Sequence, residues 1–500
     1  MRYVPCQWTV CLPSRLSNIS AVTEAGKQIT LAAFLYKQKL NYLNILNFID
    51  INTIKDTINN EIIFIRLDKK SEKSWSVSTM SKQATVELMC KGAVLERLHN
   101  RTILNGALPE QPEQKVTSTD GLRRKHRVRH MKIGVPKEIK THEYRVGLIP
   151  HAVAELCRDG HSVVIERGAG VGAGFVDGEY ESVGAELVDS AEAVFEAADL
   201  IVKVKEPQPS ERALLNERHT LFTYLHLAPD LTQTTDLLAS GAMCIAYETV
   251  TDRAGRLPLL APMSEVAGRL SVQAGAHCLE RAQGGRGVLL SGVAGVERGH
   301  VLILGGGVVG QQALRMALGL EAQVTVIDIN LDSLRTIDQR FAGRVNTRYS
   351  TQAAIAELVQ GADLVIGSVL IPGAAAPKLV SEEMISTMMP GSVIVDVAID
   401  QGGCFATSRP TTHAEPTFLH DDVVHYCVAN MPGAVPRTSS LALNQATLPF
   451  VKRLAAGPKA ALMNDPHLRA GLATKSGYLT SEHVAEAHSL DWQPAEKVLN

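Results

Sequence analysis

The amino-acid sequence predicts an α/β fold in which two doubly wound parallel sheets follow one another along the chain. Two observations predict this class. From residue 131 on, short apolar runs of the kind that form buried strands alternate with stretches of helical spacing. In the second half, a glycine-rich turn at 305–310 joins one such strand to a helix. Because the loops of two such domains face each other, we expect a cleft between them.

The strongest motif lies in the segment 300–330. A short apolar run at 301–304 precedes Gly305, Gly307 and Gly310, which have the spacing G-x-G-x-x-G. In this pattern the first glycine makes a tight turn, the second lets the backbone approach a pyrophosphate, and the third lets helix and strand pack closely. Unpaired N–H groups at the start of the helix favour the phosphates. The motif therefore predicts a dinucleotide-binding domain of the Rossmann type rather than a chance glycine turn.

Asp328 ends the second apolar run, about twenty residues after the glycines. A carboxylate at this place accepts hydrogen bonds from the adenosine ribose and repels a 2′-phosphate. Ile329 and Asn330 supply no arginine that could receive such a phosphate. The sequence therefore favours NAD over NADP as cofactor.

Composition excludes several other classes of protein. The net charge of the 500-residue chain is −2, so no strong basic field is available to bind nucleic acid. No run reaches the roughly eighteen apolar residues that a membrane helix requires. The eight cysteines are scattered without a C-x-x-C pair, a pattern that fits reduced thiols in a cytoplasmic enzyme better than disulfides or a zinc site. We expect no metal centre.

Residues 1–130 differ from the rest of the chain. The stretch 40–67 is crowded with Asn, Ile and Lys, and 121–130 is a dense basic run. One interpretation is a targeting or nucleic-acid-binding arm. The segment has neither an apolar signal-peptide core nor a clear amphipathic repeat, so we favour a poorly ordered extension or a start codon placed too far upstream of Met131.

The remaining strands and helices are predicted from apolar runs and from the Gly, Pro and polar residues that separate them. Strands are expected from Met131, at 161–166, 200–205, 221–225, 243–247, 301–304, 324–327, 364–370, 392–399 and 425–428. Helices are expected at 151–159, 191–197, from 260 and after the glycine motif, and the chain is mainly helical from Arg437 on. The expected domains are a discontinuous substrate domain, 131–258 with 437–500, and a dinucleotide domain, 259–436.

Four polar residues at predicted strand ends or in loops are candidates for chemistry. Arg145 suits a substrate carboxylate, which a planar guanidinium binds with two hydrogen bonds, although a surface ion pair with Glu143 is an equal alternative. Lys205 is suited to a carbonyl or carboxylate oxygen, or is a solvated lysine. His226 is suited to acid–base work near neutral pH, or is a structural histidine. Asp400 is placed to reach the ribose or the reacting centre, or caps a helix.

From Met131 to its end, the chain closely resembles alanine dehydrogenases, whose family also contains the transhydrogenase alpha subunit. The resemblance spans roughly three quarters of the chain. It rests on long runs such as GVPKEIKTHEYRVGLIP, ADLIVKVKEP, LFTYLHLA, LPLLAPMSEVAGRL, DVAIDQGGCF and VANMPGAVPRTSS. Residues 1–130 have no counterpart in the family.

The resemblance implies an NAD-dependent, reversible oxidative deamination of L-alanine to pyruvate and ammonium by a homo-hexamer. It implies that Arg145 and Lys205 bind the substrate and that His226 and Asp400 are catalytic. The implied cofactor contacts are Ser264, Asp328, Ser350, Val369, Leu370, Asp400, Val428, Asn430 and Met431, besides the three glycines. Three alternatives stay open: a transhydrogenase-type NAD(H)-binding subunit, a non-catalytic NAD-binding protein, and a different substrate such as glycine, which is converted to glyoxylate, because a pocket for one methyl group discriminates by only ~1–3 kcal/mol.

Overall fold

The computed structural model describes residues 130–369 and 376–500, together with the backbone of five short strands nearer the N-terminus. The chain divides into two units, Met1–Arg123 and Arg124–Asn500. In the first unit, β1 (Trp8–Cys11), β5 (Ser74–Met80) and β4 (Ile62–Leu67) form an antiparallel sheet, and β2 (Asn18–Val22) pairs with β3 (Gln28–Ala32). Apart from these strands, the extension expected at 1–130 lies outside the described residues.

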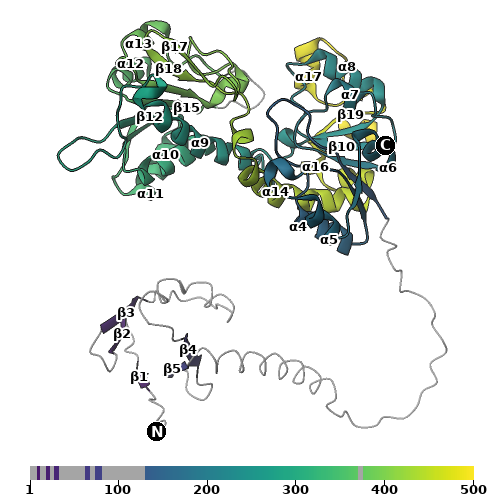
Figure 1. Cartoon of the computed structure of the whole chain (residues 1–500), viewed down its shortest axis with the longest axis horizontal. Helices are drawn as coiled ribbons and strands as arrows, with labels where there is room; N and C mark the ends of the chain where they lie inside the picture. The colour runs from purple at the N-terminus through teal and green to yellow at the C-terminus, as the bar shows by residue number, and fades with distance from the viewer. Residues whose placement is uncertain are drawn as a thin grey trace. The chain divides into compact units, whose positions relative to one another are not determined.

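The second unit contains two sheets of mainly parallel strands with helices packed around them (Figure 1). The first sheet has the order β20-β19-β11-β10-β9-β6-β7-β8. Its six parallel strands are β6 (Lys132–Val135), β7 (Ser162–Glu166), β8 (Glu186–Val188), β9 (Leu200–Val202), β10 (Thr220–Thr223) and β11 (Met243–Ala246). Antiparallel β19 (Leu472–Lys475) and β20 (Tyr478–Leu479) extend it beyond β11, so the C-terminal segment joins this sheet.

The second sheet has the order β14-β13-β12-β15-β16-β18-β17. Its parallel strands are β12 (His300–Leu304), β13 (Gln323–Asp328), β14 (Asn346–Tyr349), β15 (Leu364–Gly367), β16 (Val393–Asp396) and β18 (Val423–Tyr426). The edge strand β17 (Thr417–His420) is antiparallel to β18. The expected class, two Rossmann-like α/β domains, is therefore confirmed.

Both sheets are buried on two faces. Along β12, Val301 and Ile303 belong to one apolar cluster, whereas Leu302 and Leu304 belong to another on the opposite face. The covering helices of the first domain include α4 (Pro150–Arg158), α5 (Asp177–Ser182), α6 (Ala191–Ala197), α7 (Pro209–Arg212) and α8 (Leu231–Ser240). Those of the second include α10 (Val308–Gly319), α11 (Leu331–Phe341), α12 (Gln352–Gln360) and α13 (Glu382–Ser386).

Helices also connect the two domains. The long helices α9 (Ala261–Cys278) and α14 (Pro436–Ala456) pack against each other, and α9 also packs against α10. After α14 come α15 (Pro458–Asn464), α16 (Pro466–Arg469), α17 (Glu482–His488) and α18 (Ala495–Leu499). Among the helices that the structure describes, none has the length and apolarity needed to cross a membrane.

Counted along the chain, the parallel strands of each sheet have the spatial order 3-2-1-4-5-6. In such sheets the connections run in opposite directions on either side of the first strand, and ligands bind where the loops diverge, at the carboxyl ends of the strands. These points lie between β6 and β9 in the first sheet and between β12 and β15 in the second. The loops at both of these points lead to residues that the sequence predicts to be functional.

Candidate active site

The loop after β6 carries Arg145, which is buried with 2% of its surface exposed. Its Nε donates to Glu143 Oε1 at 2.7 Å, and its Nη2 donates to Glu143 Oε2 at 2.5 Å and to Asn430 Oδ1 at 2.6 Å. The Asn430 amide donates in turn to Glu143 Oε2 at 3.0 Å. The ion pair with Glu143 that the sequence allowed is thus present, but it is buried rather than on the surface.

This network leaves Arg145 with one nitrogen that lacks a strong partner. Nη1 contacts only the Met263 thioether sulfur, at 3.1 Å, which is a weak acceptor. The sequence predicts that Arg145 binds a substrate carboxylate with two hydrogen bonds. Such a bidentate contact would require the Arg145 nitrogens that donate to Glu143 to release it. In the arrangement observed, Arg145 offers a substrate Nη1 alone.

Arg145 also controls the charge of its neighbour. Burial favours the neutral form of Glu143, but hydrogen bonds and charge attraction from Arg145 outweigh burial and lower the pKa of Glu143 to about 2. Asn430 holds the second domain against this pair, and its own backbone is left-handed, with φ of 67°. Asparagine tolerates that conformation better than most residues.

The low pKa of Glu143 predicts a pH-dependent contribution to stability. A carboxyl group with a depressed folded-state pKa stabilises fully above its unfolded value of 4.5, and the contribution disappears as the pH falls toward 2. The contribution of Glu143 to the free energy of unfolding is about 3 kcal/mol at neutral pH. We expect the difference in unfolding free energy between the wild-type chain and Glu143→Gln, measured in urea, to shrink steadily below pH 4.5. A constant difference from pH 7 to pH 3 would contradict this assignment.

Lys205 lies three residues beyond β9, which ends at Val202 and is shorter than expected. Its side chain is 9% exposed, and its ammonium donates no hydrogen bond to any residue that the structure describes. Burial lowers the pKa of Lys205, while the charges of Glu206 and Asp400 oppose that effect and the charge of Arg145 adds to it. The charges of Arg145 and Asp400 therefore both act on Lys205, although no hydrogen bond or ion pair among the described residues joins either side chain to it.

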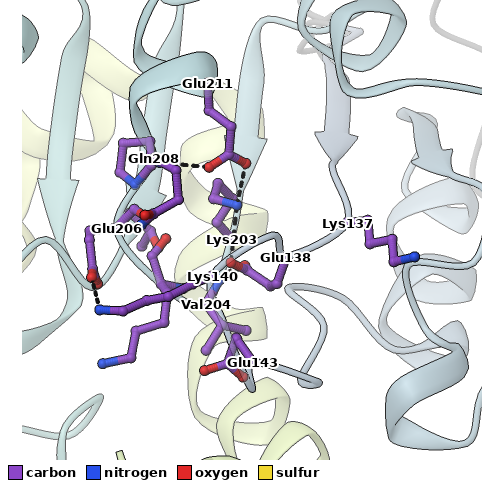
Figure 2. A network of polar contacts seen from close by, with 12 residues as sticks. Lys137, Glu138, Lys140, Glu143, Lys203, Val204, Glu206, Gln208 and Glu211 are labelled. Atoms are coloured by element: carbon purple, nitrogen blue, oxygen red, sulfur yellow. Dashed lines mark hydrogen bonds and ion pairs between the residues drawn. The ribbon is translucent and has the colours of Figure 1, made fainter.

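A buried ion triad beside Lys205 was not predicted from the sequence. Lys203 is fully buried, and its ammonium donates to Glu138 Oε2 at 3.1 Å and to Glu211 Oε1 at 2.6 Å (Figure 2). Burial alone would lower the pKa of Lys203, but the two carboxylates raise it. A lysine in an otherwise apolar buried run, LIVKV, is the signal that was available, because a buried charge requires a partner.

Lys140 and Glu206 form a second ion pair in the same region (Figure 2). One carboxylate oxygen of Glu206, Oε2, is buried without a hydrogen-bond partner in the described structure. Burial raises the pKa of Glu206, but Lys205 and Lys140 outweigh it, and the pKa is lowered. Glu206 therefore supplies negative charge beside the Lys205 ammonium.

His226 follows β10 and has an exposed side chain. Its backbone is left-handed, with φ of 48°, and its N–H donates to Glu248 Oε1 at 2.7 Å. The imidazole stacks on the buried Tyr224 ring at 5.8 Å between centroids, with 10° between the planes. Tyr224 is fixed in turn by a 2.6 Å hydrogen bond to the Leu259 carbonyl. An exposed ring on a strained, held backbone favours a functional histidine over a structural one.

Asp400 lies in the 3-10 helix η4 (Val397–Gln401), four residues after β16 ends. The helix-cap alternative for Asp400 is wrong, because Asp396 is the residue that caps η4, through the Ala398 N–H. The buried Asp396 also accepts from Ser408 Oγ at 2.6 Å and from the Cys404 N–H at 2.9 Å. Asp396 thus fixes the turn that leaves the Asp400 carboxylate exposed.

The glycine motif forms the turn between β12 and α10. Gly305 has φ of 102°, a conformation that side chains rarely allow, and a Cβ on Gly310 would lie 1.9 Å from the Gly305 carbonyl oxygen. A Cβ on Gly307 would meet nothing within 4 Å. Asp328 Oδ2 accepts the Gly306 N–H at 2.6 Å, so the acid at the end of β13 is tied to the glycine loop. An open backbone at the start of a twelve-residue helix fits a pyrophosphate.

The other predicted cofactor contacts surround the same sheet edge or the junction with α9. Ser264 is in the first turn of α9, Ser350 donates its N–H to the Asp328 carbonyl, and Val369 follows β15 beside Gly305. Val428 and Met431 are buried on either side of Asn430. Leu370 lies outside the described residues.

Within 130–369 and 376–500 there is no group of three or more His, Cys, Asp or Glu side chains placed to hold a metal ion. The described cysteines are all free thiols. The chemistry of the site is therefore considered through its cations, its carboxylates and His226.

Two family models match the chain: the N-terminal domain of alanine dehydrogenase/PNT over residues 134–267 and the C-terminal domain over 271–482. The alanine dehydrogenase of Halomonas elongata is 58% identical over 370 residues, which are 74% of this chain and 100% of that protein. The alanine dehydrogenase of Mycolicibacterium smegmatis is 53% identical over 370 residues, with the same coverage.

Solved structures give the same result. A structure titled L-alanine dehydrogenase is 52% identical, with a TM-score of 0.70, and the match covers 72% of this chain and 99% of that one. A transhydrogenase from Sinorhizobium meliloti is 25% identical with a TM-score of 0.61, over 70% of this chain and 99% of that one. Both domain models match, and relatives are more than half identical along their whole length; the chain belongs to the alanine dehydrogenase/PNT family.

Proposed function

We propose that the chain catalyses the reversible oxidative deamination of L-alanine to pyruvate and ammonium, with NAD as the cofactor. The single observation that carries the proposal is the buried side chain of Lys205, whose ammonium donates no hydrogen bond to any described residue and on which the charges of Arg145 and Asp400 act. A buried cation of this kind requires an anionic or carbonyl ligand. Pyruvate supplies both groups, and the relatives named above are alanine dehydrogenases.

Substrate binding is shared between two cations. Arg145 Nη1 and the Lys205 ammonium are the available donors, so the carboxylate binds between them and the carbonyl oxygen faces Lys205. Glu143 and Asn430 fix the guanidinium, which reduces the freedom lost when the substrate binds. Positioning of this kind contributes several kcal/mol to catalysis in well-oriented reactions, about 7 or more at best.

The cofactor is held by the second sheet. The open backbone at Gly307 and the N-terminus of α10 receive the pyrophosphate, and Asp328 receives the adenosine ribose. A bound nicotinamide supplies the hydride acceptor for the oxidation of the alanine Cα–H bond. Asn430, Met431 and Val428 lie on the loop that joins this sheet to Arg145, and we assign them to the nicotinamide end.

The chain's own groups manage the protons. When hydride leaves Cα and the amino nitrogen loses one proton to solvent, an iminium remains, and His226 accepts a proton from the water that adds to the iminium carbon, which gives a carbinolamine. His226 then returns this proton to the nitrogen, the C–N bond breaks to release ammonia as the carbonyl group forms, and the hydroxyl proton passes back through His226 to the ammonia, which leaves as ammonium. Asp400 assists this transfer and orients the ribose. The exposed imidazole of His226 has the access to water that both steps require.

The test is an assay of the purified chain for NADH oxidation with pyruvate plus ammonium, and with each alone. Turnover that requires both substrates supports the proposal. NADH binding without turnover would favour a transhydrogenase-type subunit or a non-catalytic NAD-binding protein. A chain beginning at Met131, assayed in parallel, shows whether residues 1–130 contribute to the activity.

The choice of NAD depends on the Asp328 charge. A 2′-phosphate about 5 Å from this carboxylate would be disfavoured by about 3 kcal/mol at an effective dielectric constant of 20. We expect Asp328→Ser combined with Ile329→Arg to raise kcat/KM for NADPH by roughly 10- to 100-fold, measured against NADH in the same preparation. Asp328→Asn, which keeps an acceptor for the Gly306 N–H, is the matched control for the loss of charge. An unchanged preference in the double variant would count against this role.

Assembly and domain limits belong to the same proposal. The loop that carries Leu289, Val293 and Val296 leaves each of these side chains more than 60% exposed, which supports burial against a second copy of the chain. We propose a homo-hexamer, which light scattering on the purified chain tests. The substrate domain comprises 131–258 and 437–500, and the cofactor domain comprises 259–436. The cytoplasm remains the compartment we predict.

A further inference from the structure

Strands β6 and β9 of the first sheet are paired over only a short length, and a side chain bonds the backbone where this pairing ends. Strands β6 and β9 are neighbours, with Ile133 opposite Leu200 and Gly134 opposite Ile201. Beyond this register the chain after β6 leaves the sheet, whereas residues 203–205 continue toward the site. On the β10 side these residues stay bonded, since the Lys203 N–H donates to Phe222 O and Val204 O accepts from the Tyr224 N–H, each at 3.2 Å.

On the opposite side a carboxylate takes the place of the missing strand. Glu138 Oε1 accepts the Val204 N–H at 2.7 Å and lies 3.4 Å from the Lys205 N–H. Its other oxygen accepts from the Lys203 ammonium at 3.1 Å. Glu138 is buried, with 7% of its surface exposed.

The remaining members of the triad hold Glu138 in place. The Lys203 ammonium is bonded to Glu211, whose second oxygen accepts the Gln208 N–H at 2.8 Å at the start of α7 (Figure 2). The Lys203 carbonyl accepts from the Tyr247 hydroxyl at 3.0 Å. The backbone of 203–205 is therefore bonded on one side to β10 and the residue that follows it, and on the other side to Glu138, with Tyr247 as a further partner.

We propose that Glu138 is a positioning residue that fixes the backbone of Val204 and Lys205, and through it the place of the Lys205 ammonium, with Lys203 and Glu211 as its supports. This inference rests on the proposed function, because it gives Lys205 its role. Glu138 thus acts on the location of the Lys205 ammonium and not on its charge. The charges of Glu206, Arg145, Asp400 and Lys140 act on the Lys205 ammonium, whereas Glu138 contacts the backbone N–H groups of Val204 and Lys205.

Two substitutions separate the roles of Glu138. Glu138→Gln keeps an oxygen for the Val204 N–H but loses the charge that pairs with Lys203. Glu138→Ala loses both. We expect both variants to be less stable, but only Glu138→Ala to raise the KM for pyruvate, by about 10- to 100-fold, because small displacements of binding groups cost that much. The Kd for NADH should stay within about twofold in both, since the cofactor site is on the other sheet.

Hydrogen exchange followed by mass spectrometry measures how firmly the backbone N–H groups of Val204 and Lys205 are held, and it does not require activity. We expect faster exchange in Glu138→Ala than in Glu138→Gln. Tyr180→Phe, which removes a buried hydroxyl bonded to the Leu148 carbonyl in the same domain, is the control for lost stability alone.

The outcomes are distinguishable. Equal pyruvate KM and equal exchange in the two Glu138 variants would overturn the positioning role and leave a structural one. Faster exchange in Glu138→Ala with an unchanged KM would also overturn it, since the backbone would then move without consequence for the substrate. If the wild-type chain does not turn over pyruvate, the proposed function fails, and the exchange comparison still decides whether Glu138 fixes this backbone.

Discussion

Replacing His226 by alanine is expected to lower kcat for pyruvate and ammonium by roughly 100- to 10,000-fold, the usual range for a lost acid–base group. The fold should not suffer, because the imidazole is exposed and its described contact is the stacking on Tyr224. The backbone bond to Glu248 does not involve the side chain, so the loop keeps its anchor. NADH should still bind, so steady-state kinetics, NADH titration and thermal unfolding of the same preparation measure the loss of turnover, the retained cofactor binding and the retained stability.

A matched control is available on the surface. His277, at the end of α9, has an exposed ring near Glu280, and His277→Ala should leave turnover unchanged. Added imidazole should restore part of the activity of His226→Ala and none in the control. Near-normal turnover of His226→Ala without added imidazole would remove this histidine from the mechanism.

Replacing Lys205 by methionine should abolish most activity while leaving the fold as stable as before or more stable. The Lys205 side chain is buried, and burial outweighs the nearby opposite charges in lowering its pKa, so its removal relieves a desolvation cost. Loss of a donor that stabilises developing charge on an oxygen lowers kcat by about 100- to 1,000-fold in comparable sites. Kinetics and chemical unfolding of one preparation test both parts.

Lys203→Met is the control, since it changes the same residue type two positions away. Its ammonium is paired with Glu138 and Glu211, and its loss leaves two buried carboxylates uncompensated, at a cost of about 3–5 kcal/mol. The two substitutions should therefore change stability in opposite directions. A similar loss of stability in both would show that Lys205 is a structural lysine and would end its assignment to substrate binding.

The sequence predicts the central strands of this fold because their residues are buried on both faces. The run at 301–304 is apolar throughout and the run that begins at 364 is interrupted only by Gly367 and Ser368, and the structure has strands there, although β15 ends at Gly367. The edge strands β8, β14 and β17 were not predicted. Asn346–Tyr349 and Thr417–His420 have exposed residues on an edge, so they show neither an apolar run nor a clear alternation.

The candidate site divides in a similar way. Arg145, Lys205 and Asp400 could be singled out because residues at strand ends and in loops are where α/β sheets bind ligands. Their partners could not. Glu143, Asn430 and Glu138 act through contacts between segments as many as 287 residues apart, which no local pattern encodes. The hydrogen bonds that Glu143 and Asn430 accept from Arg145 leave it only one nitrogen for a substrate, and this became visible only in three dimensions.

The bonds of Asn430 have a thermodynamic consequence. This residue belongs to the loop that we assign to the nicotinamide and is hydrogen-bonded to the arginine that we assign to the substrate. If one ligand shifts the equilibrium of that shared amide, the affinity for the other changes. Linkage then requires the change to be reciprocal: the factor by which NADH alters the affinity for pyruvate equals the factor by which pyruvate alters the affinity for NADH. Under that condition a single side chain couples the two ligands that we assign to the site.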